Sequence, residues 1–487
     1  MRAPTGTRLR TARSTTSVSR RTLLSLLAVG LLVAATACRL VRDERPNIIF
    51  ILVDTLRADY LGAYGFEGRV SPEMDALARE SILFRNCFTQ SPWTKPAVAT
   101  LFTSLHPQVH GLTNHEGKYW GEATPEMRTG ILSRRATTLA ERLRESGYET
   151  AGFIANPWLD AAYGFDQGFD VYYDEETDFS TTARHLMDDV RAWFDAREAD
   201  KPYFLYLHLM DVHAPYSASR PDFITVRQSP TLQSDHILGP KEMPDLRWHN
   251  LEIRPSWATD EMRREVAYWR ARYASGVRAT DRRLGLFLDY LRKRNELDSS
   301  ILVLTSDHGE ELFEHGDWSH GQSLFDHQLR IPLIIRNPQG RGGGVEVDTF
   351  IDLIDLMPTL LAVARAEPPE GMQGRDMSAV LEGHPVERPE FTFATATQRI
   401  PRFYSVRTAR HKLLLHLDTE WQRLFEMAND GTEHEDVSAR EPEVAQELRD
   451  RLLAHIRDSV AGGTLETETA EIPEELQERL RALGYLQ

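Results

Sequence analysis

Carboxylates and imidazoles follow the apolar segments of this sequence. Asp54 comes directly after the apolar run Asn47–Val53, and Asp307 and His308 come just after a second run, Ile301–Leu304. If both runs are buried parallel strands, their carboxyl ends meet at one edge of a sheet, where ligands bind in open α/β folds. Two carboxylates and one imidazole would then converge. Asp54 alone could equally be a turn or helix-cap residue.

Histidines are concentrated around the second of these motifs. Four lie within twenty residues, where 17 histidines in 487 residues would place fewer than one: His308, His315, His320 and His327. A solvated loop does not require that density, whereas a divalent metal site does. We therefore expect one divalent ion, held by Asp54, Asp307 and His308. The imidazole favours Zn²⁺ or Mn²⁺ over Ca²⁺, which prefers oxygen ligands.

A threonine lies where a helix can begin. Thr94 and Lys95 precede Pro96, and proline suits the first turn of a helix because its missing N–H needs no partner there. Thr94 is predicted to be the N-cap residue, in the positive potential of the helix start. Its hydroxyl could be only a cap or, with a metal on its oxygen, a nucleophile and a fourth ligand. Lys95 would add positive charge for an anionic substrate.

Strand and helix patterns alternate along the chain that must position these residues. Apolar runs predict further strands at Tyr148–Ile154, Tyr203–Leu209 and Ile331–Ile335. Helical spacing is found over Pro72–Ile82, Thr138–Ser146, Glu261–Arg294 and Leu353–Ala364. The alternation predicts an α/β fold with a mostly parallel central sheet and helices on both faces. The proline-rich stretch Ser217–Trp257 is expected to be a long surface loop.

The pattern changes near residue 365. Residues 366–374 are rich in proline, glycine and glutamate, and short β-rich runs dominate from Phe391 to Leu417. A helical pattern follows over Glu441–Val460. We expect a catalytic domain over 46–390 and, over 391–487, a small antiparallel sheet with one helix.

The first 38 residues are expected to be an export signal. They contain six arginines and no acidic residue, and the apolar run Leu23–Ala37 has 15 residues, which is short for a membrane-spanning helix. Ser19–Leu24 resembles a twin-arginine signal, and Ala35–Cys38 resembles a bacterial lipoprotein cleavage box. We expect cleavage and lipidation at Cys38. The lipid would anchor the exported protein to a membrane of the cell envelope, outside the cytoplasm. An uncleaved anchor is the alternative.

The overall composition excludes several classes of protein. Hydrophobic residues make up 41% and charged residues 27%, as in ordinary globular proteins. A net charge of −16 is unfavourable for nucleic acid, which needs a basic surface, so no nucleic-acid partner is expected. Two cysteines cannot form a disulfide framework. The oligomeric state is left open.

Several motifs together resemble the sulfatase family of the alkaline phosphatase superfamily. Asn47–Gly65 resembles the opening of these enzymes, Ser306–Glu310 their second metal motif and His208–Tyr216 their substrate-binding histidine segment. The resemblance spans about residues 46–487. It implies an alkaline phosphatase-like fold and a metal-dependent ester hydrolase. It also implies that His213 and His320 bind the equatorial oxygens of the substrate or protonate the leaving oxygen.

The sequence departs from the sulfatase pattern at functional positions. Sulfatases carry at the nucleophile position a Cys or Ser that is oxidised to formylglycine; Thr94 cannot give that aldehyde, so no formylglycine is expected. Asp54–Thr55 replaces the usual Asp-Asp pair, and Asp307–His308 replaces Asp-Asn. The Lys and His of the Gly-Lys-Trp-His segment are absent at Ile154–Pro157.

A Thr nucleophile with an Asp-His pair is similar to phosphonate and phosphodiester hydrolases and to phosphoethanolamine transferases of the superfamily. The transferases also have a histidine twelve residues after Asp-His, where His320 stands. The sequence therefore predicts a metal-dependent hydrolase of phosphate or phosphonate (di)esters. The alternatives are a sulfatase, an envelope phosphotransferase and an inactive binding protein with the same fold.

Overall fold

The computed structural model describes most of the chain from residue 45 onward. It covers residues 45–113, 128–174, 183–197, 201–214, 216, 222, 226, 260–386, 389–395, 398, 400–474 and 477. The expected export signal, Cys38 and nearly all of the expected loop Ser217–Trp257 lie outside these residues. Within them, no helix has the length and apolar character needed to cross a membrane.

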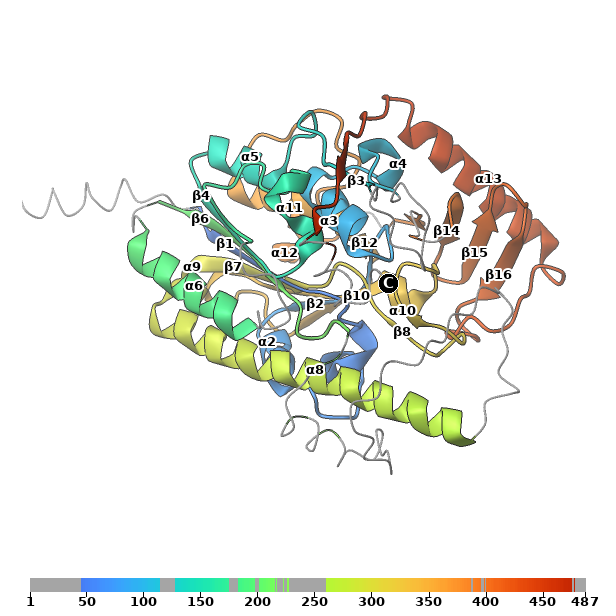
Figure 1. Cartoon of the computed structure of the whole chain (residues 1–487), viewed down its shortest axis with the longest axis horizontal. Coiled ribbons are helices and arrows are strands. Elements are labelled where there is room, and N and C mark those ends of the chain that lie inside the picture. The colour runs from blue at the N-terminus through green and yellow to red at the C-terminus, as the bar shows by residue number, and fades with distance from the viewer. Residues whose placement is uncertain are drawn as a thin grey trace, which may run out of the picture. The chain divides into compact units, whose positions relative to one another are not determined.

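A nine-stranded sheet forms the centre of the described chain (Figure 1). Its strands are β1 (Asn47–Val53), β2 (Ile82–Phe88), β4 (Glu149–Ile154), β5 (Val171–Tyr173), β6 (Tyr203–Leu209), β7 (Ser300–Thr305), β10 (Arg330–Arg336), β11 (Val345–Val347) and β12 (Ile351–Asp352). The order is β11-β2-β10-β7-β1-β6-β4-β5, with β12 beside β2. Of these nine strands only β10 runs against its neighbours, which confirms the mostly parallel sheet.

Strand β1 shows why the sequence there is continuously apolar. It pairs with β6 on one side and β7 on the other, and both of its faces are covered by helices. Ile48, Phe50 and Leu52 belong to one core, and Ile49 and Ile51 belong to the other. Helices of the first core are α3 (Thr94–Thr103), α5 (Leu139–Glu145) and α11 (Leu356–Ala364). Helices of the second are α2 (Pro72–Arg79), α6 (Ala183–Ala196) and α8 (Asp260–Lys293).

One predicted helix is longer in the sequence pattern than in the structure. Helix α2 ends at Arg79, and Ile82, expected to be its last apolar residue, begins strand β2 instead. Ile82 pairs with Ile335 of β10, so sheet pairing prevails over the local helical spacing. Helix α5 matches its predicted range because Thr138 caps it in a reciprocal hydrogen-bonded box with Glu141.

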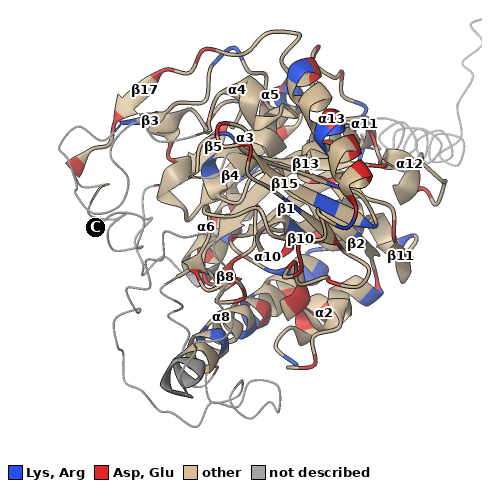
Figure 2. Cartoon of the chain, turned by 90° about the vertical axis from the view of Figure 1, so that its right-hand side faces the viewer, with Lys and Arg blue, Asp and Glu red and all other residues tan. Residues whose placement is uncertain are grey.

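The C-terminal part contains the predicted antiparallel sheet and helix. The strands are β13 (Thr392–Ala394), β14 (Phe403–Arg407), β15 (His411–His416) and β16 (Gln422–Glu426), and the helix is α13 (Pro442–Ser459). One side of this sheet packs on α13 and the other on the Leu324–Leu329 segment of the catalytic part. Figure 2 shows basic and acidic residues interspersed along α8 and α13.

The remaining elements are short. Besides short 3-10 helices, they are β3 (Arg128–Gly130), β8 (Glu311–Leu312), β9 (Trp318–Ser319), β17 (Thr469–Glu471), α4 (Pro107–His110), α9 (Glu296–Ser299), α10 (Asp326–Leu329) and α12 (Ser378–Leu381). Strand β17 returns to pair with β3, and β8 forms a hairpin with β9.

Candidate active site

The carboxyl ends of four adjacent strands bring the polar residues together. Asp54 follows β1 and Asp307 follows β7, while His208 lies near the end of β6 and Asn156 follows β4. The strand order β7-β1-β6-β4 makes these ends neighbours. All four side chains are fully buried. The site therefore depends on topology, since its residues are far apart in the sequence.

Asp54, Asp307 and His308 form a compact set of possible metal ligands. One donor atom from each lies within 4.8 Å of the other two. Asp54 Oδ1 and Asp307 Oδ2 are buried without a hydrogen-bond partner in the described chain. His308 Nδ1 lies 2.8 Å from the carbonyl oxygen of Gly309, so Nδ1 donates and Nε2 keeps a lone pair. Two orphaned carboxylate oxygens and an imidazole nitrogen with a lone pair fit a divalent cation.

The charges of this set also favour a bound cation. Burial raises the pKa of Asp307, and the nearby Asp54 carboxylate raises it further. Burial opposes ionisation of Asp54, but the hydrogen bond with His208 and the neighbouring histidines hold the pKa of Asp54 well below its usual range. Burial lowers the pKa of His308 to about 4, which keeps the ring neutral and able to bind a metal.

Thr94 lies beside these ligands, but the predicted N-cap role is wrong. Trp93, in extended backbone with φ −154° and ψ 157°, is the N-cap residue of α3, and Thr94 is the first helical residue. This N-cap residue makes no side-chain capping hydrogen bond. The Thr94 hydroxyl instead lies 3.4 Å from Asp54 Oδ2 and 3.3 Å from His308 Nε2. The hydroxyl is thus directed at the ligand set and is not used to begin the helix.

Two residues that sequence reasoning did not assign to the site complete its hydrogen bonds. The Asn156 amide donates to Asp54 Oδ2 at 2.6 Å and to Thr94 Oγ1 at 3.3 Å. Its Oδ1 accepts from the backbone N–H of Trp158 at 2.9 Å, which fixes the amide orientation. His208 Nε2 lies 3.1 Å from the same Asp54 oxygen. The available signal was position: both residues stand at the ends of predicted strands.

His213 and His320 lie next to the ligand set. The His320 ring centroid is 4.4 Å from that of His308 and 5.0 Å from that of His213. His213 Nδ1 donates to the Ala214 carbonyl oxygen at 2.7 Å, and His320 Nδ1 lies 3.1 Å from Glu310 Oε1. In both rings the hydrogen bond at Nδ1 leaves Nε2 as the nitrogen suited to a substrate.

Lys95, the predicted substrate-binding cation, contacts other residues. Its ammonium donates to Thr129 Oγ1 at 2.7 Å and lies 3.8 Å from the centre of the Tyr163 ring and 5.7 Å from that of Trp158. Burial lowers the pKa of Lys95 well below its usual value. These contacts connect α3 to β3. The Lys95 side chain is thus directed away from Thr94, because adjacent residues of a helix face different directions.

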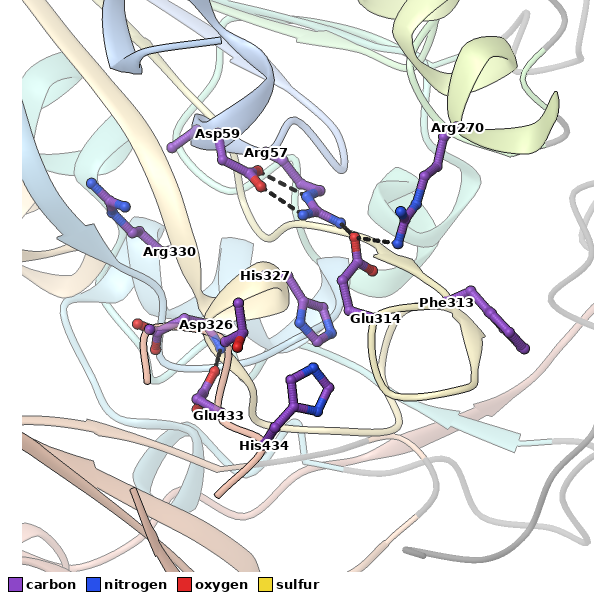
Figure 3. Close-up of a pocket in the computed structure, with 13 residues that line it drawn as sticks. Arg57, Asp59, Arg270, Phe313, Glu314, Asp326, His327, Arg330, Glu433 and His434 are labelled. Carbon is purple, nitrogen blue, oxygen red and sulfur yellow. Dashed lines mark hydrogen bonds and ion pairs between the residues drawn. The ribbon is translucent and has the colours of Figure 1, made fainter. Parts of the chain in front are cut away.

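A cavity of about 490 Å³ is lined by charged residues, and Asp54, Thr94 and Asp307 are not among its lining residues (Figure 3). Arg57 and Arg270 pair with Glu314 there, at 2.8 and 3.4 Å, and Arg57 also pairs with Asp59. Glu314 belongs to a second set of possible metal ligands, with Glu311 and His327. Because Glu314 already pairs with two arginines, Asp54 and its neighbours are the better metal site.

Comparison with protein families gives two matches. The model described as "Sulfatase" matches residues 46–366. The model described as "N-sulphoglucosamine sulphohydrolase, C-terminal" matches residues 313–458.

Curated relatives cover most of the chain at low identity. An N-acetylglucosamine-6-O-sulfatase of Bacteroides thetaiotaomicron is 24% identical over an alignment of 501 positions, gaps included. The alignment covers 85% of this chain and 87% of that protein. The multifunctional alkaline phosphatase superfamily protein PehA of Trinickia caryophylli is 26% identical over an alignment of 413 positions, gaps included. This alignment covers 70% of this chain and 78% of that protein.

Solved structures share the fold. BT4656, in complex with its substrate D-glucosamine-2-N,6-O-disulfate, superposes with a TM-score of 0.68 at 22% identity and covers 85% of this chain and 98% of its own. The phosphonate monoester hydrolase of Agrobacterium radiobacter gives a TM-score of 0.67 at 21% identity, covering 88% of this chain and 99% of its own.

Proposed function

The chain belongs to the sulfatase family, and we propose that it is a metal-dependent hydrolase of sulfate esters in which Thr94 is the nucleophile. The observation that carries this proposal is the Thr94 hydroxyl, within 3.4 Å of both Asp54 and His308. The relatives favour sulfate, the alternative in the sequence analysis, over the phosphate esters preferred there.

Asp54, Asp307 and His308 would hold the metal, with Thr94 beside it. A divalent cation, Zn²⁺ or Mn²⁺ by its donor set, would neutralise substrate charge and acidify the nearby hydroxyl. Asn156 orients Thr94 through its amide. Thr94 Oγ loses its proton to solvent and attacks sulfur in line, as the bond to the leaving oxygen breaks. His213 and His320 bind the equatorial oxygens or give the leaving oxygen its proton, and water then releases the sulfuryl group.

A second candidate is hydrolysis of phosphate or phosphonate diesters, and the residue at the nucleophile position favours it. Oxidation of a threonine gives a ketone and not the formylglycine aldehyde, so Thr94 would act as the alcohol itself. PehA and the phosphonate monoester hydrolase show that relatives and structural neighbours of this chain extend beyond proteins named sulfatases.

The proposal includes the location of the enzyme. The arginine-rich start, the apolar run Leu23–Ala37 and Cys38 support export and a lipid anchor. The substrate would then be an anionic ester outside the cytoplasm.

A substrate panel tests the proposed function. Purified protein with Zn²⁺ or Mn²⁺ is assayed on an aryl sulfate, a sugar 6-sulfate, an aryl phosphodiester and a phosphonate monoester, with Thr94→Ala as the background. We expect the highest kcat/KM on a sulfate ester. A higher kcat/KM on the phosphodiester or the phosphonate would favour the second candidate instead.

A further inference from the structure

A hairpin places Glu310 opposite His320. In β8–β9, Leu312 pairs with Trp318 and Glu311 pairs with Ser319. The next position of this antiparallel register brings Glu310 to His320. Both side chains are buried, 0% and 2% exposed, and Glu310 Oε1 lies 3.1 Å from His320 Nδ1. The hairpin therefore delivers a carboxyl group to one specific ring nitrogen.

The His320 ring is held from several sides. The His308 and His213 rings pack against it, with centroids 4.4 and 5.0 Å away, and Glu310 takes its Nδ1. Because Glu310 contacts Nδ1, Nε2 is the ring nitrogen that would contact an ester bound at Thr94. Packing alone would not choose between the two orientations of the ring, because a half-turn about Cβ–Cγ puts a ring carbon in the place of each nitrogen. The contact with Glu310 makes that choice.

Burial of the Glu310 carboxyl group costs free energy. Glu310 Oε2 has no hydrogen-bond partner at ordinary distance within the described residues, and the Tyr216 hydroxyl is another polar group near this carboxyl. Because this burial is costly, the contact of the carboxyl group with His320 is expected to be useful. The neighbouring Glu311 points the other way, as alternation along a strand requires, and bonds to His327. The two adjacent glutamates thus serve two histidines on opposite faces of the hairpin.

We propose that Glu310 is a positioning residue that holds the His320 ring by Nδ1, so that Nε2 meets the leaving oxygen of the ester. This proposal rests on the proposed hydrolase function. It assigns proton donation to the leaving oxygen to His320, and leaves the equatorial oxygens to His213.

Two esters of the class that the wild type hydrolyses, one with a nitrophenol and one with an alkyl alcohol as leaving group, test this role. Only the alkyl ester needs a proton on its leaving oxygen. Since a well-placed general acid contributes about 10²–10⁴-fold, Glu310→Ala should lower kcat on the alkyl ester by at least about 30-fold. The loss on the nitrophenyl ester should be at most about threefold, with KM nearly unchanged. Glu310→Gln, whose amide can still hold Nδ1, should lose less than about fivefold on either ester.

A double-mutant cycle shows whether Glu310 acts through His320. In the His320→Ala background, Glu310→Ala should change kcat by less than about twofold. Additive losses, or equal losses on the two esters, would overturn the proposal. The matched control is Glu311→Gln, which alters the other buried pair and should leave the ratio of the two activities unchanged.

A readout independent of activity separates this proposal from the proposed function. The ¹⁵N resonance of His320 Nδ1 should shift in Glu310→Ala and stay in place in Glu311→Gln. If the wild type hydrolyses no sulfate ester, the proposed function fails while this test still applies with a phosphodiester pair. An unchanged resonance in Glu310→Ala would overturn the positioning role whatever the substrate.

Discussion

The two oxygens of Asp54 have different environments. Oδ2 lies within hydrogen-bond distance of Asn156, His208 and Thr94, at 2.6, 3.1 and 3.4 Å. Oδ1 is buried and has no hydrogen-bond partner in the described chain. One oxygen thus organises the protein groups, and the other is left for a cation.

Asn156→Ala tests whether the hydrogen bonds of the Asn156 amide to Asp54 Oδ2 and Thr94 Oγ1 orient the nucleophile. The variant removes a donor to a carboxylate, and such buried hydrogen bonds contribute about 1.5–3 kcal/mol. We expect kcat to fall by roughly ten- to a hundredfold, because Thr94 loses its orientation, while metal content is unchanged. Steady-state kinetics and elemental analysis of the purified variant measure both. A variant with wild-type kcat would show that the amide does not orient the nucleophile.

Asp307→Asn tests the cation-binding half. The substitution keeps the size of the side chain but removes a negative charge, so bound metal and activity should fall together. In the wild type, exhaustive chelation should abolish turnover, and Zn²⁺ or Mn²⁺ should restore it. Metal content is measured on the purified proteins after dialysis. Full activity after chelation would contradict the assigned metal site.

At the scale of elements, α8 supports the start of α2. Asp281 of α8 accepts hydrogen bonds from the backbone N–H groups of Glu73 and Met74, at 2.9 and 2.8 Å. These groups lack partners within their own helix. Asp281 is fully buried, and burial raises its pKa to about 7. A carboxyl group therefore connects the two helices and titrates near neutral pH.

This pKa predicts a pH dependence of stability. Asp281 is protonated in the folded protein below about pH 7, whereas in the unfolded chain it ionises near its ordinary value of 3.8. Its contribution is therefore fully present below pH 3.8 and is lost as the pH rises to 7. Asp281→Asn keeps the acceptor oxygen but cannot ionise, so the variant should gain free energy of unfolding relative to wild type between pH 4 and pH 7. Urea unfolding at several pH values measures the difference, and a constant difference would refute the pKa shift.

The elements differ in how well the sequence predicted them. Strand β1 was predicted with its bounds because burial on both faces leaves a continuous apolar run, and Asp54 followed from it. Strand β2 was missed because Arg85 and Asn86 interrupt its apolar pattern and its first residue continues the helical spacing of α2. Pairing with β10, about 250 residues away in the sequence, determines that strand.

In the candidate site, Asp54, Asp307 and His308 were predicted to lie together, whereas Asn156 and His208 were not assigned to it. Asp307 and His308 stand together in the sequence, so their chemistry was visible. Asn156 and His208 become neighbours of Asp54 only through the order β1-β6-β4, which a single sequence does not specify. Thr94 was taken for an N-cap because the start of a helix can be predicted only to within a residue or two.

At the scale of the whole molecule, ion pairs join the C-terminal sheet to the catalytic part. Asp326 of α10 pairs with Arg407 of β14 and Lys412 of β15, at 3.0 and 2.7 Å, and Lys412 is fully buried. Helix α10 begins six residues after His320. The C-terminal sheet thus fixes one end of the segment that carries a proposed catalytic histidine.

Cys38→Ala tests the proposed location of the molecule. Without the thiol, no lipid can be attached at this position, so the protein should leave the membrane fraction or remain unprocessed. Fractionation of cells and the mass of the mature N-terminus report the two outcomes. Normal processing with unchanged membrane retention would contradict a lipid anchor at Cys38.

Turnover by Thr94→Ala, compared with Thr94→Ser at equal metal occupancy, tests most directly whether Thr94 is the nucleophile. Since Thr94 does not cap α3, Thr94→Ala should leave the unfolding temperature nearly unchanged. Thr94→Ser retains a hydroxyl and should keep part of the activity, whereas Thr94→Ala should lose several powers of ten in kcat. If Thr94→Ala stays within about tenfold of wild type, a barrier difference of only ~1.4 kcal/mol, Thr94 is not the nucleophile.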